Sequence, residues 1–344
     1  MISHSLGLRL APFAGVVSLG MLLISGCGRG TSSLAGKGPV STNSPSGPNV
    51  STGAQLGLIW NSGDSTLRML VGVPGSTQLG PALFPVGAYA TGAFAPSTQT
   101  ALLIDPKGNL QVMTLPSLVP STVAQSISAS SVIAFAPRGG YAGVFVPGST
   151  SVLMVSGLPQ SPALSTVSAA ASIQGAAISD AGTLLLATGA ASGVVTITSI
   201  SAGGTRSSMA SLAGYGGMSF IAGSEDSLIA DASANTVARY HSGVATVLAT
   251  HANGLNQPFA VAASQDGHWA VTADQADHSL LRIDLTGATS PAQSTCTCSP
   301  TQLSSLSGNA VFELAAPAAT PGWMIEADGL TSRVLFIPPV PGGQ

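Results

Sequence analysis

The chain has 344 residues, with 10 Lys and Arg against 13 Asp and Glu, so only 7% of its side chains are charged and the formal net charge is −3. A typical soluble domain carries about 25% charged residues. Together with 45% hydrophobic residues and a mean hydropathy of +0.45, this low charge excludes a disordered chain. The lack of a Lys/Arg cluster argues against nucleic acid as a partner, and 42 Gly and 23 Pro favour short strands and turns over helices.

Residues 1–26 have the pattern of a targeting segment. Arg9 and the amino terminus give a weakly positive start, and an apolar run follows at 10–24. This run is too short for a transmembrane helix, which needs roughly 20 residues. We therefore expect a cleaved signal peptide; an uncleaved anchor and an ordinary signal peptide followed by an unrelated Cys are the alternatives.

The apolar run ends in Ile24-Ser25-Gly26-Cys27. This tetrapeptide resembles the bacterial lipobox, in which small residues before a Cys admit the lipoprotein signal peptidase. The resemblance implies that the Cys27 thiol carries a lipid such as palmitate and attaches the mature protein to a membrane of the bacterial cell envelope. Gly28 stands where inner-membrane lipoproteins often carry Asp, which favours the outer membrane.

We expect residues 27–54 to form the lipidated Cys and a flexible tether. Gly, Ser, Pro, Thr and Asn make up 20 of the 27 residues from 28 to 54, and such a coil spans ~30 Å. Without residues 1–26 the chain keeps 9 basic and 13 acidic residues, a net charge of −4. It therefore has no electrostatic attraction to an anionic membrane, and the lipid is its attachment.

Residues 55–340, followed by a tail at 341–344, contain a repeat of about 42 residues. An apolar strand recurs with anchors at Phe94, Phe135, Ile178, Phe220, Val261 and Phe312, spaced by 41, 43, 42, 41 and 51 residues. Each is followed by a polar turn, a second apolar strand, another turn and a third strand, which is the strand-and-hairpin signature. A hairpin at 58–70 matches the later units except that it lacks the first strand, and it brings their number to seven.

This periodicity predicts an all-β fold, a β-propeller of seven blades with about four antiparallel strands each; six and eight blades are the alternatives. The stretch from Ala270 to Asp284, Ala-Val-Thr-Ala-Asp-Gln-Ala-Asp-His-Ser-Leu-Leu-Arg-Ile-Asp, resembles a unit of the YVTN/NHL-like bacterial propellers. The Tyr-Val-Thr-Asn tetrapeptide itself is absent. The resemblance supports the fold, because propellers host unrelated activities.

Acidic or amide side chains end the second strand of five units: Asn61, Asp105, Asp231, Asp274 and Asp328. An Arg stands on the following strand in four of them: Arg68, Arg239, Arg282 and Arg333. A ring of acid–base groups is one interpretation. We favour a structural one, in which each Asp accepts hydrogen bonds from turn amides and pairs with Arg across the hairpin.

The positions expected on or just before the innermost strands are nearly uncharged. They are Thr91, Ser130, Gln174, Gly216, Asn256, Gln257 and Asn309, with Glu313 as the one acidic residue. One carboxylate among amides is a poor site for a hard cation, and His241, His251, His268 and His278 lack ligand spacing. We therefore predict no catalytic residues, no metal and no cofactor.

The amides Gln174, Asn256, Gln257 and Asn309 are the candidate binding residues, and we expect them to line a neutral channel mouth. Uncharged donors and acceptors suit a peptide or a carbohydrate. The alternative is that these amides cap strands and face water. Residues 286–309, the longest departure from the repeat, are expected to form an exposed, blade-specific loop.

Cys296 and Cys298 lie within that loop. In an oxidising compartment they would pair as a local structural staple. Free thiols, or a redox or metal role, are the alternatives, although two thiols without a nearby His fall short of a zinc site.

These observations favour an envelope lipoprotein whose monomeric propeller acts as a non-catalytic binding or scaffold module for a protein or an envelope polymer. A periplasmic hydrolase or lactonase-like propeller enzyme is the second hypothesis. A carbohydrate-binding propeller is the third, but Trp60, Trp269 and Trp323 all fall on predicted strands.

Overall fold

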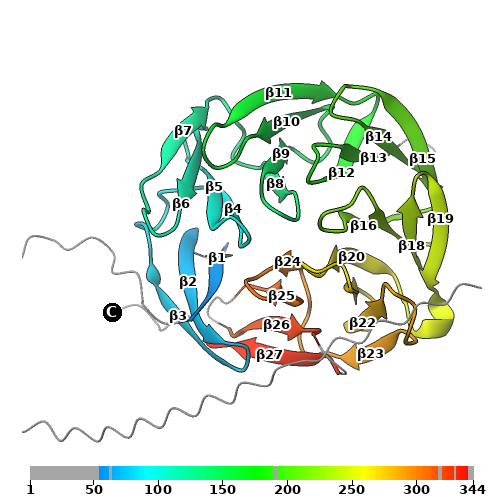
Figure 1. Ribbon diagram of the computed structural model, residues 1–344. Helices are drawn as coiled ribbons and strands as arrows, with labels where there is room; N and C mark the ends of the chain where they lie inside the picture. The colour runs from blue at the N-terminus through cyan, green and yellow to red at the C-terminus, as the bar shows by residue number, and fades with distance from the viewer. Residues whose placement is uncertain (1–53, 62–63, 190–192, 317–319, 329–330, 340–344) are drawn as a thin grey trace, which may run out of the picture. The chain divides into compact units, whose positions relative to one another are not determined.

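Each sequence repeat forms one antiparallel sheet, and seven such sheets form a ring (Figure 1). The computed structural model describes residues 54–61, 64–189, 193–316, 320–328 and 331–339. Cys27 and the expected signal peptide lie outside the described residues. The prediction of an all-β, seven-bladed propeller is confirmed, and the described residues include a single short helix, η1 (His251–Asn253).

The strands follow one another from blade to blade in chain order. The first blade, as far as it is described, has three strands, β1 (Gln55–Asn61), β2 (Thr66–Val73) and β3 (Ser76–Ala82). The second blade holds β4 (Thr91–Ala95), β5 (Thr100–Ile104), β6 (Leu110–Thr114) and β7 (Ser121–Ala124); the third holds β8 (Val132–Phe135), β9 (Tyr141–Phe145), β10 (Ser151–Ser156) and β11 (Ala163–Ser168). The fourth holds β12 (Ser172–Ile178), β13 (Leu184–Gly189), β14 (Val195–Ile200) and β15 (Arg206–Leu212); the fifth holds β16 (Tyr215–Phe220), β17 (Ser227–Asp231), β18 (Thr236–His241) and β19 (Val244–Ala249). The sixth holds β20 (Pro258–Ala263), β21 (Trp269–Asp274), β22 (Ser279–Asp284) and β23 (Ala292–Thr295); the seventh holds β24 (Ser304–Ser305), β25 (Val311–Ala315), β26 (Gly322–Glu326) and β27 (Arg333–Ile337).

Burial changes systematically from the inside of a blade to the outside. In blade 2 every residue of the second strand, β5, is buried, because both faces of the sheet are covered by neighbouring blades. The outermost strand of blade 3, β11, is almost entirely exposed. The hydrophobic clusters lie between blades; one joins Leu102 and Ile104 of blade 2 to Val144 and Val155 of blade 3. Because neighbouring blades cover most of each sheet, little of the sheet surface meets water and the ring needs few charged side chains.

The two ends of the ring differ in the segments that they carry. We call the end at which the chain enters each innermost strand the entry face, and the opposite end, where that strand turns back into the second strand, the return face. The longer connections between blades, 83–90, 125–131, 250–257 and 296–303, belong to the entry face, since each precedes an innermost strand. The return face carries tight turns such as the one after β12, where Gly182 has a φ of 85° that favours glycine.

The last blade corrects one part of the sequence analysis. Phe312 does not lie on an innermost strand: it belongs to β25, the second strand, which pairs with the two-residue innermost strand β24 through Ser304 and Ser305. Ser304 lies 43 residues after Val261, so the repeat keeps its length. Residues 286–309 are therefore not an insertion loop; they include β23 and β24. The expectation was wrong because β24 is too short and polar to show an apolar pattern.

Small residues let the innermost strands of neighbouring blades approach one another. Gly217 in β16 has a φ of 100°, and a Cβ built there would lie 2.8 Å from the Cα of Ala260 in β20. Glycine thus meets two requirements at this position, the left-handed backbone and the close contact between blades 5 and 6.

Candidate functional site: the central cavity and the two faces

A cavity of about 520 Å³ lies at the centre of the ring, lined mainly by the innermost strands. Ala, Val, Ile and Phe residues of β4, β8, β12, β16 and β20 form much of its wall. Polar side chains on the wall include Thr91, Ser131, Ser219, Gln302, Ser304 and Glu313. Thr91 and Glu313 were recognised from the sequence, whereas Gln302 and Ser304 were missed because the sequence does not reveal β24.

Glu313 is the one acidic residue of the cavity wall. It lies on the second strand β25, not on an innermost strand as expected, and its side chain comes to the cavity because β24 covers it with only two residues. Only 4% of Glu313 is exposed. Burial raises the pKa of its carboxyl to about 8, although a hydrogen bond with Gln302 acts in the opposite direction. Its Oε1 has no hydrogen-bond partner within the described part of the chain.

The four amides singled out in the sequence do not form one channel mouth. Gln174, Asn256 and Gln257 lie on the entry face, where they begin or precede the innermost strands β12 and β20. Asn309 lies in a turn of the return face, where its Nδ2 donates to Oδ2 of Asp266 over 2.8 Å. The lining of the cavity includes none of the four.

The surroundings of Gln174, Asn256 and Gln257 fit the alternative interpretation, in which these residues cap strands and face water. The backbone N–H of Asn256 donates to Asp274, and that of Gln257 donates to the Asn235 side chain over 2.7 Å. Gln174 is exposed and lies against Gly189 of its own blade. These contacts hold strand ends in place and leave the amide of Gln257 in an exposed position.

Asp274 is the second acidic residue with an unusual environment. It is fully buried at the end of β21, where Oδ2 accepts hydrogen bonds from the Asn256 N–H and the Ser279 hydroxyl. Burial raises its pKa to about 6, against these two bonds, and the nearby Asp277 adds to the rise.

The structural interpretation of the repeated Asp is confirmed for the turn contacts of Asp105 and Asp231. Asp105 accepts hydrogen bonds from the backbone of Lys107 and Asn109, and its pKa is held below the usual range by the Asn109 side chain and by these bonds. Asp231 accepts four backbone N–H groups, from Ala213, Gly214, Ser233 and Ala234. Asp328 is exposed.

The expected pairing of these Asp with Arg across each hairpin is wrong. Arg239 pairs with Asp226 at the opposite end of the hairpin, Arg333 pairs with Glu326, and Arg68 pairs with Asp64. Arg282 lies over the ring of Trp269, 4.4 Å from its centroid. In blade 5, Asp231 is already occupied by turn amides, and Arg239 reaches Asp226 instead.

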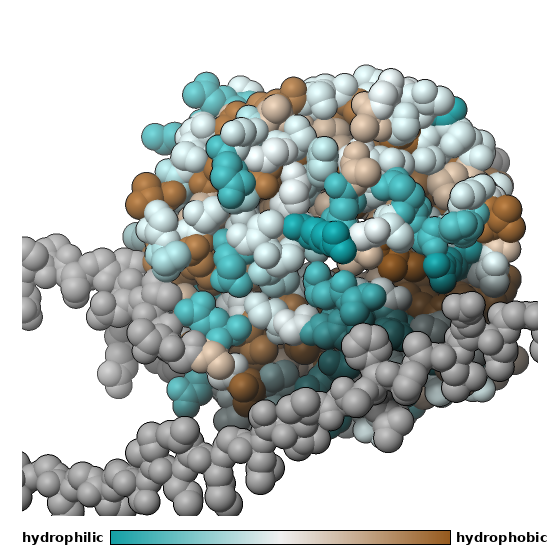
Figure 2. Space-filling view, viewed as in Figure 1, coloured by the Kyte–Doolittle hydropathy of each residue, from teal (hydrophilic) through white to brown (hydrophobic). Residues whose placement is uncertain are grey.

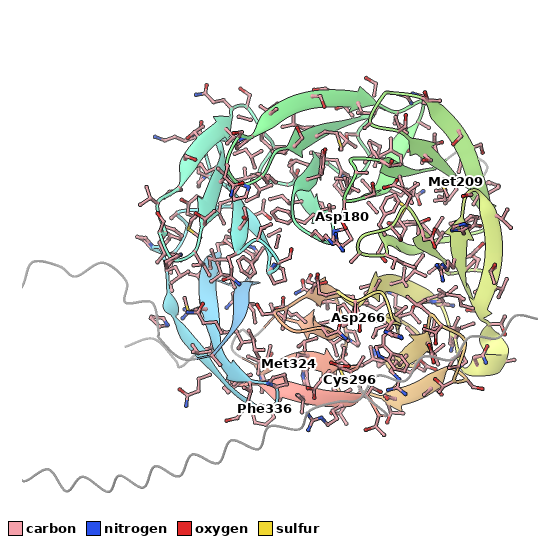
Figure 3. All side chains as sticks on the ribbon, viewed as in Figure 1. Asp180, Met209, Asp266, Cys296, Met324 and Phe336 are labelled. Carbon is pink, nitrogen blue, oxygen red and sulfur yellow. A yellow bond between two sulfur atoms is a disulfide. The ribbon has the colours of Figure 1, made fainter. Side chains whose placement is uncertain are left out.

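The return face is held together by polar contacts between adjacent blades. Asp180 accepts from the N–H of Arg138 over 2.7 Å and from the N–H of Gly223 over 2.8 Å, so one carboxylate joins blades 3, 4 and 5. Asp266 and Asn309 join blades 6 and 7 in a similar way. Figure 3 labels Asp180 and Asp266 at the inner rim of the ring, and in the same view Figure 2 shows hydrophilic side chains gathered there. The turns were recognised in the sequence, but their contacts across blades were not.

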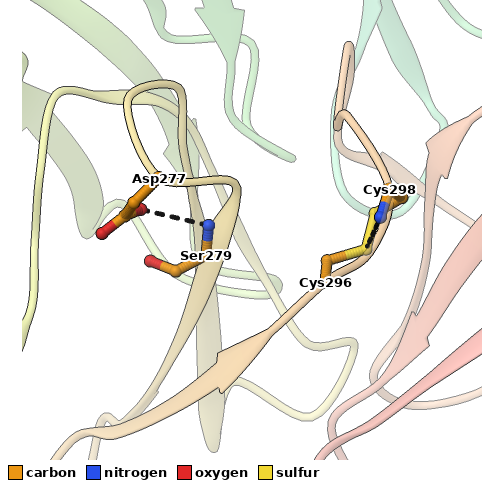
Figure 4. The surroundings of a disulfide bond; sticks show 4 residues. All are labelled: Asp277, Ser279, Cys296 and Cys298. Carbon is orange, nitrogen blue, oxygen red and sulfur yellow. Dashed lines mark hydrogen bonds between the residues drawn. A yellow bond between two sulfur atoms is a disulfide. The ribbon is translucent and has the colours of Figure 1, made fainter.

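Cys296 and Cys298 are joined by a disulfide directly after β23 (Figure 4). Cys298 is buried in the hydrophobic cluster between blades 6 and 7, where Ala262, Phe312 and Leu314 also lie. The Cys296 N–H donates to the carbonyl of His278, whose turn also holds the bond from the Ser279 N–H to Asp277. The pair therefore joins the connection at 296–303 to the core of the ring.

The described residues contain neither a candidate metal-binding cluster nor a membrane-spanning helix. No group of three or more His, Cys, Asp and Glu side chains is placed to hold a metal ion in that part of the chain. No helix there is long and apolar enough to cross a membrane.

In fold, the chain is similar to several solved structures of low sequence identity. A functionally unknown protein from Desulfotomaculum acetoxidans DSM 771 matches with a TM-score of 0.56 at 13% identity, over 83% of this chain and 100% of that one. A protein from Lactobacillus plantarum matches with a TM-score of 0.56 at 12% identity, over 83% and 96%. Streptogramin B lyase matches with a TM-score of 0.55 at 11% identity, over 80% and 87%.

No protein-family model matches the sequence, and a search of curated proteins finds no match. At 11–13% identity the structural similarities show the fold alone. The class defined by the described residues is a seven-bladed β-propeller with a central cavity and one buried carboxyl on its wall.

Proposed function

We propose that this protein is a lipid-anchored bacterial envelope protein whose propeller is a non-catalytic binding or scaffold module for a protein or an envelope polymer. The observation that carries the proposal is the use of the carboxylates. Asp105, Asp180, Asp231 and Asp266 all bind turn amides or neighbouring blades, which is a structural task. The lipobox-like sequence ending at Cys27 supports the attachment to a membrane.

The entry face is the better candidate for the binding surface. Its connections are the longer ones, and in repeat folds such segments vary without disturbing the core. On the return face, the turns around Asp180 and Asp266 are tied to adjacent blades, which leaves them less free to adapt to a partner.

A crosslinked pull-down of the lipidated protein from its own envelope, analysed by mass spectrometry, tests this function. We expect a reproducible partner that is recovered with the wild type and reduced with Cys27→Ala, because the unlipidated chain is no longer held at the membrane. If no partner is recovered, while the purified protein turns over an envelope substrate or holds a stoichiometric metal ion, the enzyme hypothesis replaces this one.

Two exposed valines provide a matched test of the face. Val86 lies on the entry face in the connection before β4, and Val119 lies on the return face between β6 and β7; they are 73% and 71% exposed. We expect Val86→Lys to reduce recovery of the partner and Val119→Lys to leave it unchanged. The reverse result would place the partner on the return face.

A further inference from the structure

Glu313 combines deep burial with an incomplete set of hydrogen bonds on the wall of the central cavity. A buried polar atom without a partner costs free energy, commonly about 1–3 kcal/mol and more for a charged group. Native structures pair nearly all such atoms, so each exception calls for an explanation. Here the carboxyl lies beside a cavity large enough for a small organic molecule.

The charges around the cavity indicate what charge a ligand bound there would carry. The residues that line it include no Lys, Arg or His, so within the described chain Glu313 faces the cavity without a counter-charge. The ionised form of this carboxyl would repel an anionic ligand, and its neutral form would give an anion no counter-charge. A cation with N–H donors would supply both a counter-charge and the missing hydrogen bond for Oε1.

The rest of the wall suits an apolar body. Three partly buried aromatic residues line it, Trp60, Phe94 and Phe135, each from a different blade. Apolar surface favours a hydrocarbon group, and aromatic faces also attract a cation. Ser219, on β16 of blade 5, has a buried hydroxyl that likewise lacks a partner among the described residues.

From this geometry we propose that the central cavity binds a small organic amine, with its ammonium group at Glu313 and its apolar body against the aromatic wall. This site lies inside the ring and is separate from the surface assigned above to a macromolecular partner. Binding of an amine forms no covalent bond; the carboxyl releases its proton to solvent when the ammonium group takes its place.

No charged group contributes to the raised pKa of Glu313, whose causes are burial and the opposing hydrogen bond to Gln302. The innermost strand β24 brings Ser304 and Ser305, and β26 places Met324 opposite Glu313. Glu326, at the end of β26, is paired with Arg333. The pH dependence of amine binding should therefore follow Glu313 itself.

Calorimetric titration of the purified full-length protein with benzylamine, benzyl alcohol and benzoate tests the proposal. These probes share one apolar body and differ in charge. We expect benzylamine to bind, and benzyl alcohol and benzoate to bind at least tenfold more weakly. Tryptophan emission should change on adding benzylamine, and the change should disappear in Trp60→Phe, which places the probe in the cavity.

Glu313→Gln keeps the size of the side chain and removes its charge, and it should weaken benzylamine binding at least tenfold. Glu225→Gln, the same change at an exposed site, is the control and should bind like the wild type. Equal binding of benzylamine and benzyl alcohol, full binding by Glu313→Gln, or no benzylamine binding would overturn the proposal.

The wild type alone supplies a second test if Glu313→Gln does not fold. The carboxyl titrates with a pKa of about 8, whereas a primary amine stays protonated from pH 6 to 8. Benzylamine affinity should therefore rise about tenfold for each pH unit over this range and level off above it. A flat profile, or one that falls, would contradict the role of Glu313. The pull-down does not depend on this result, so the two proposals can fail separately.

Discussion

At the scale of single residues, surroundings decide what each acidic side chain does. Asp231 lies at the end of a strand among four backbone N–H donors and acts as a cap. Glu313 lies among apolar strands, where burial outweighs the bond to Gln302 and favours the neutral form. The same functional group thus stabilises a turn in one blade and becomes a proton-holding group in another.

The raised pKa of Glu313 predicts how stability depends on pH. The folded protein keeps this proton up to about pH 8, whereas the unfolded chain loses it near the ordinary value of 4.5. Between these values the native state binds more protons, so the free energy of unfolding falls as the pH rises, by at most about 1.4 kcal/mol per unit.

Urea unfolding of the wild type and Glu313→Gln between pH 6.5 and 8 measures this effect. The window lies above the pKa of about 6 of Asp274, another carboxyl whose pKa is raised by burial. We expect the free energy of unfolding of the wild type to fall relative to the variant as the pH rises. A constant difference would show that Glu313 does not titrate in this range.

At the scale of elements, the turns of the return face do more than reverse the chain. Asp180, in the turn between β12 and β13, holds the backbone of the turns on both sides of it. Its side chain is 16% exposed, so these charge-assisted bonds are partly protected from water. The ion pair between Asp180 and the Arg138 side chain adds little to stability, because the two groups are 3.9 Å apart and Arg138 is largely exposed.

Asp180→Ala should lower the free energy of unfolding by about 2 kcal/mol, because two backbone N–H groups lose a charged acceptor. Asp277→Ala is the control: Asp277 is exposed and accepts a bond from Ser279 within its own turn, so its loss should cost less than about 1 kcal/mol. Denaturant titration of both variants checks this. Equal losses would mean that the bonds between blades add nothing to those within a turn.

At the scale of the whole molecule, the ring closes where the first and last blades meet. Ile59 and Leu70 of blade 1 share a buried cluster with Met324 and Ile337 of blade 7, and the Ser307 N–H donates to the carbonyl of Leu56. The outermost strands β27 and β3 also lie side by side at this junction (Figure 1). Every described blade therefore packs against two neighbours.

A closed ring should unfold as one unit. A substitution that empties a buried site at the closure should therefore lower the free energy of unfolding as much as one elsewhere in the ring. Ile59→Ala at the junction and Ile197→Ala in blade 4 both leave a void at a fully buried site. Each should lower the free energy of unfolding by about 3 kcal/mol. Exposed Val247→Ala should cost little. Unfolding followed by tryptophan emission and by circular dichroism should give one coincident transition in each variant; separate transitions for Ile59→Ala would show that the ring opens first.

The functional residues were only partly predictable from the sequence. The turn role of Asp105 and Asp231 could be predicted, because a side chain and the backbone a few residues away are joined by local geometry. The separation of Asn309 from Asn256 and Gln257 could not, because it depends on the position of β24, whose two serines carry no apolar signal. For the same reason Glu313 was placed on the wrong strand.

The sequence by itself determined the strands, their repeat of about 42 residues and the seven blades, because apolar runs and turn residues report local backbone structure and its period. The tertiary structure alone decided which blades share Asp180, which acidic partner each Arg reaches, and that Glu313 is buried beside the cavity. These contacts join residues about 40 positions apart along the chain or on opposite sides of one hairpin. Their energies depend on distance and burial, which only the closed ring fixes.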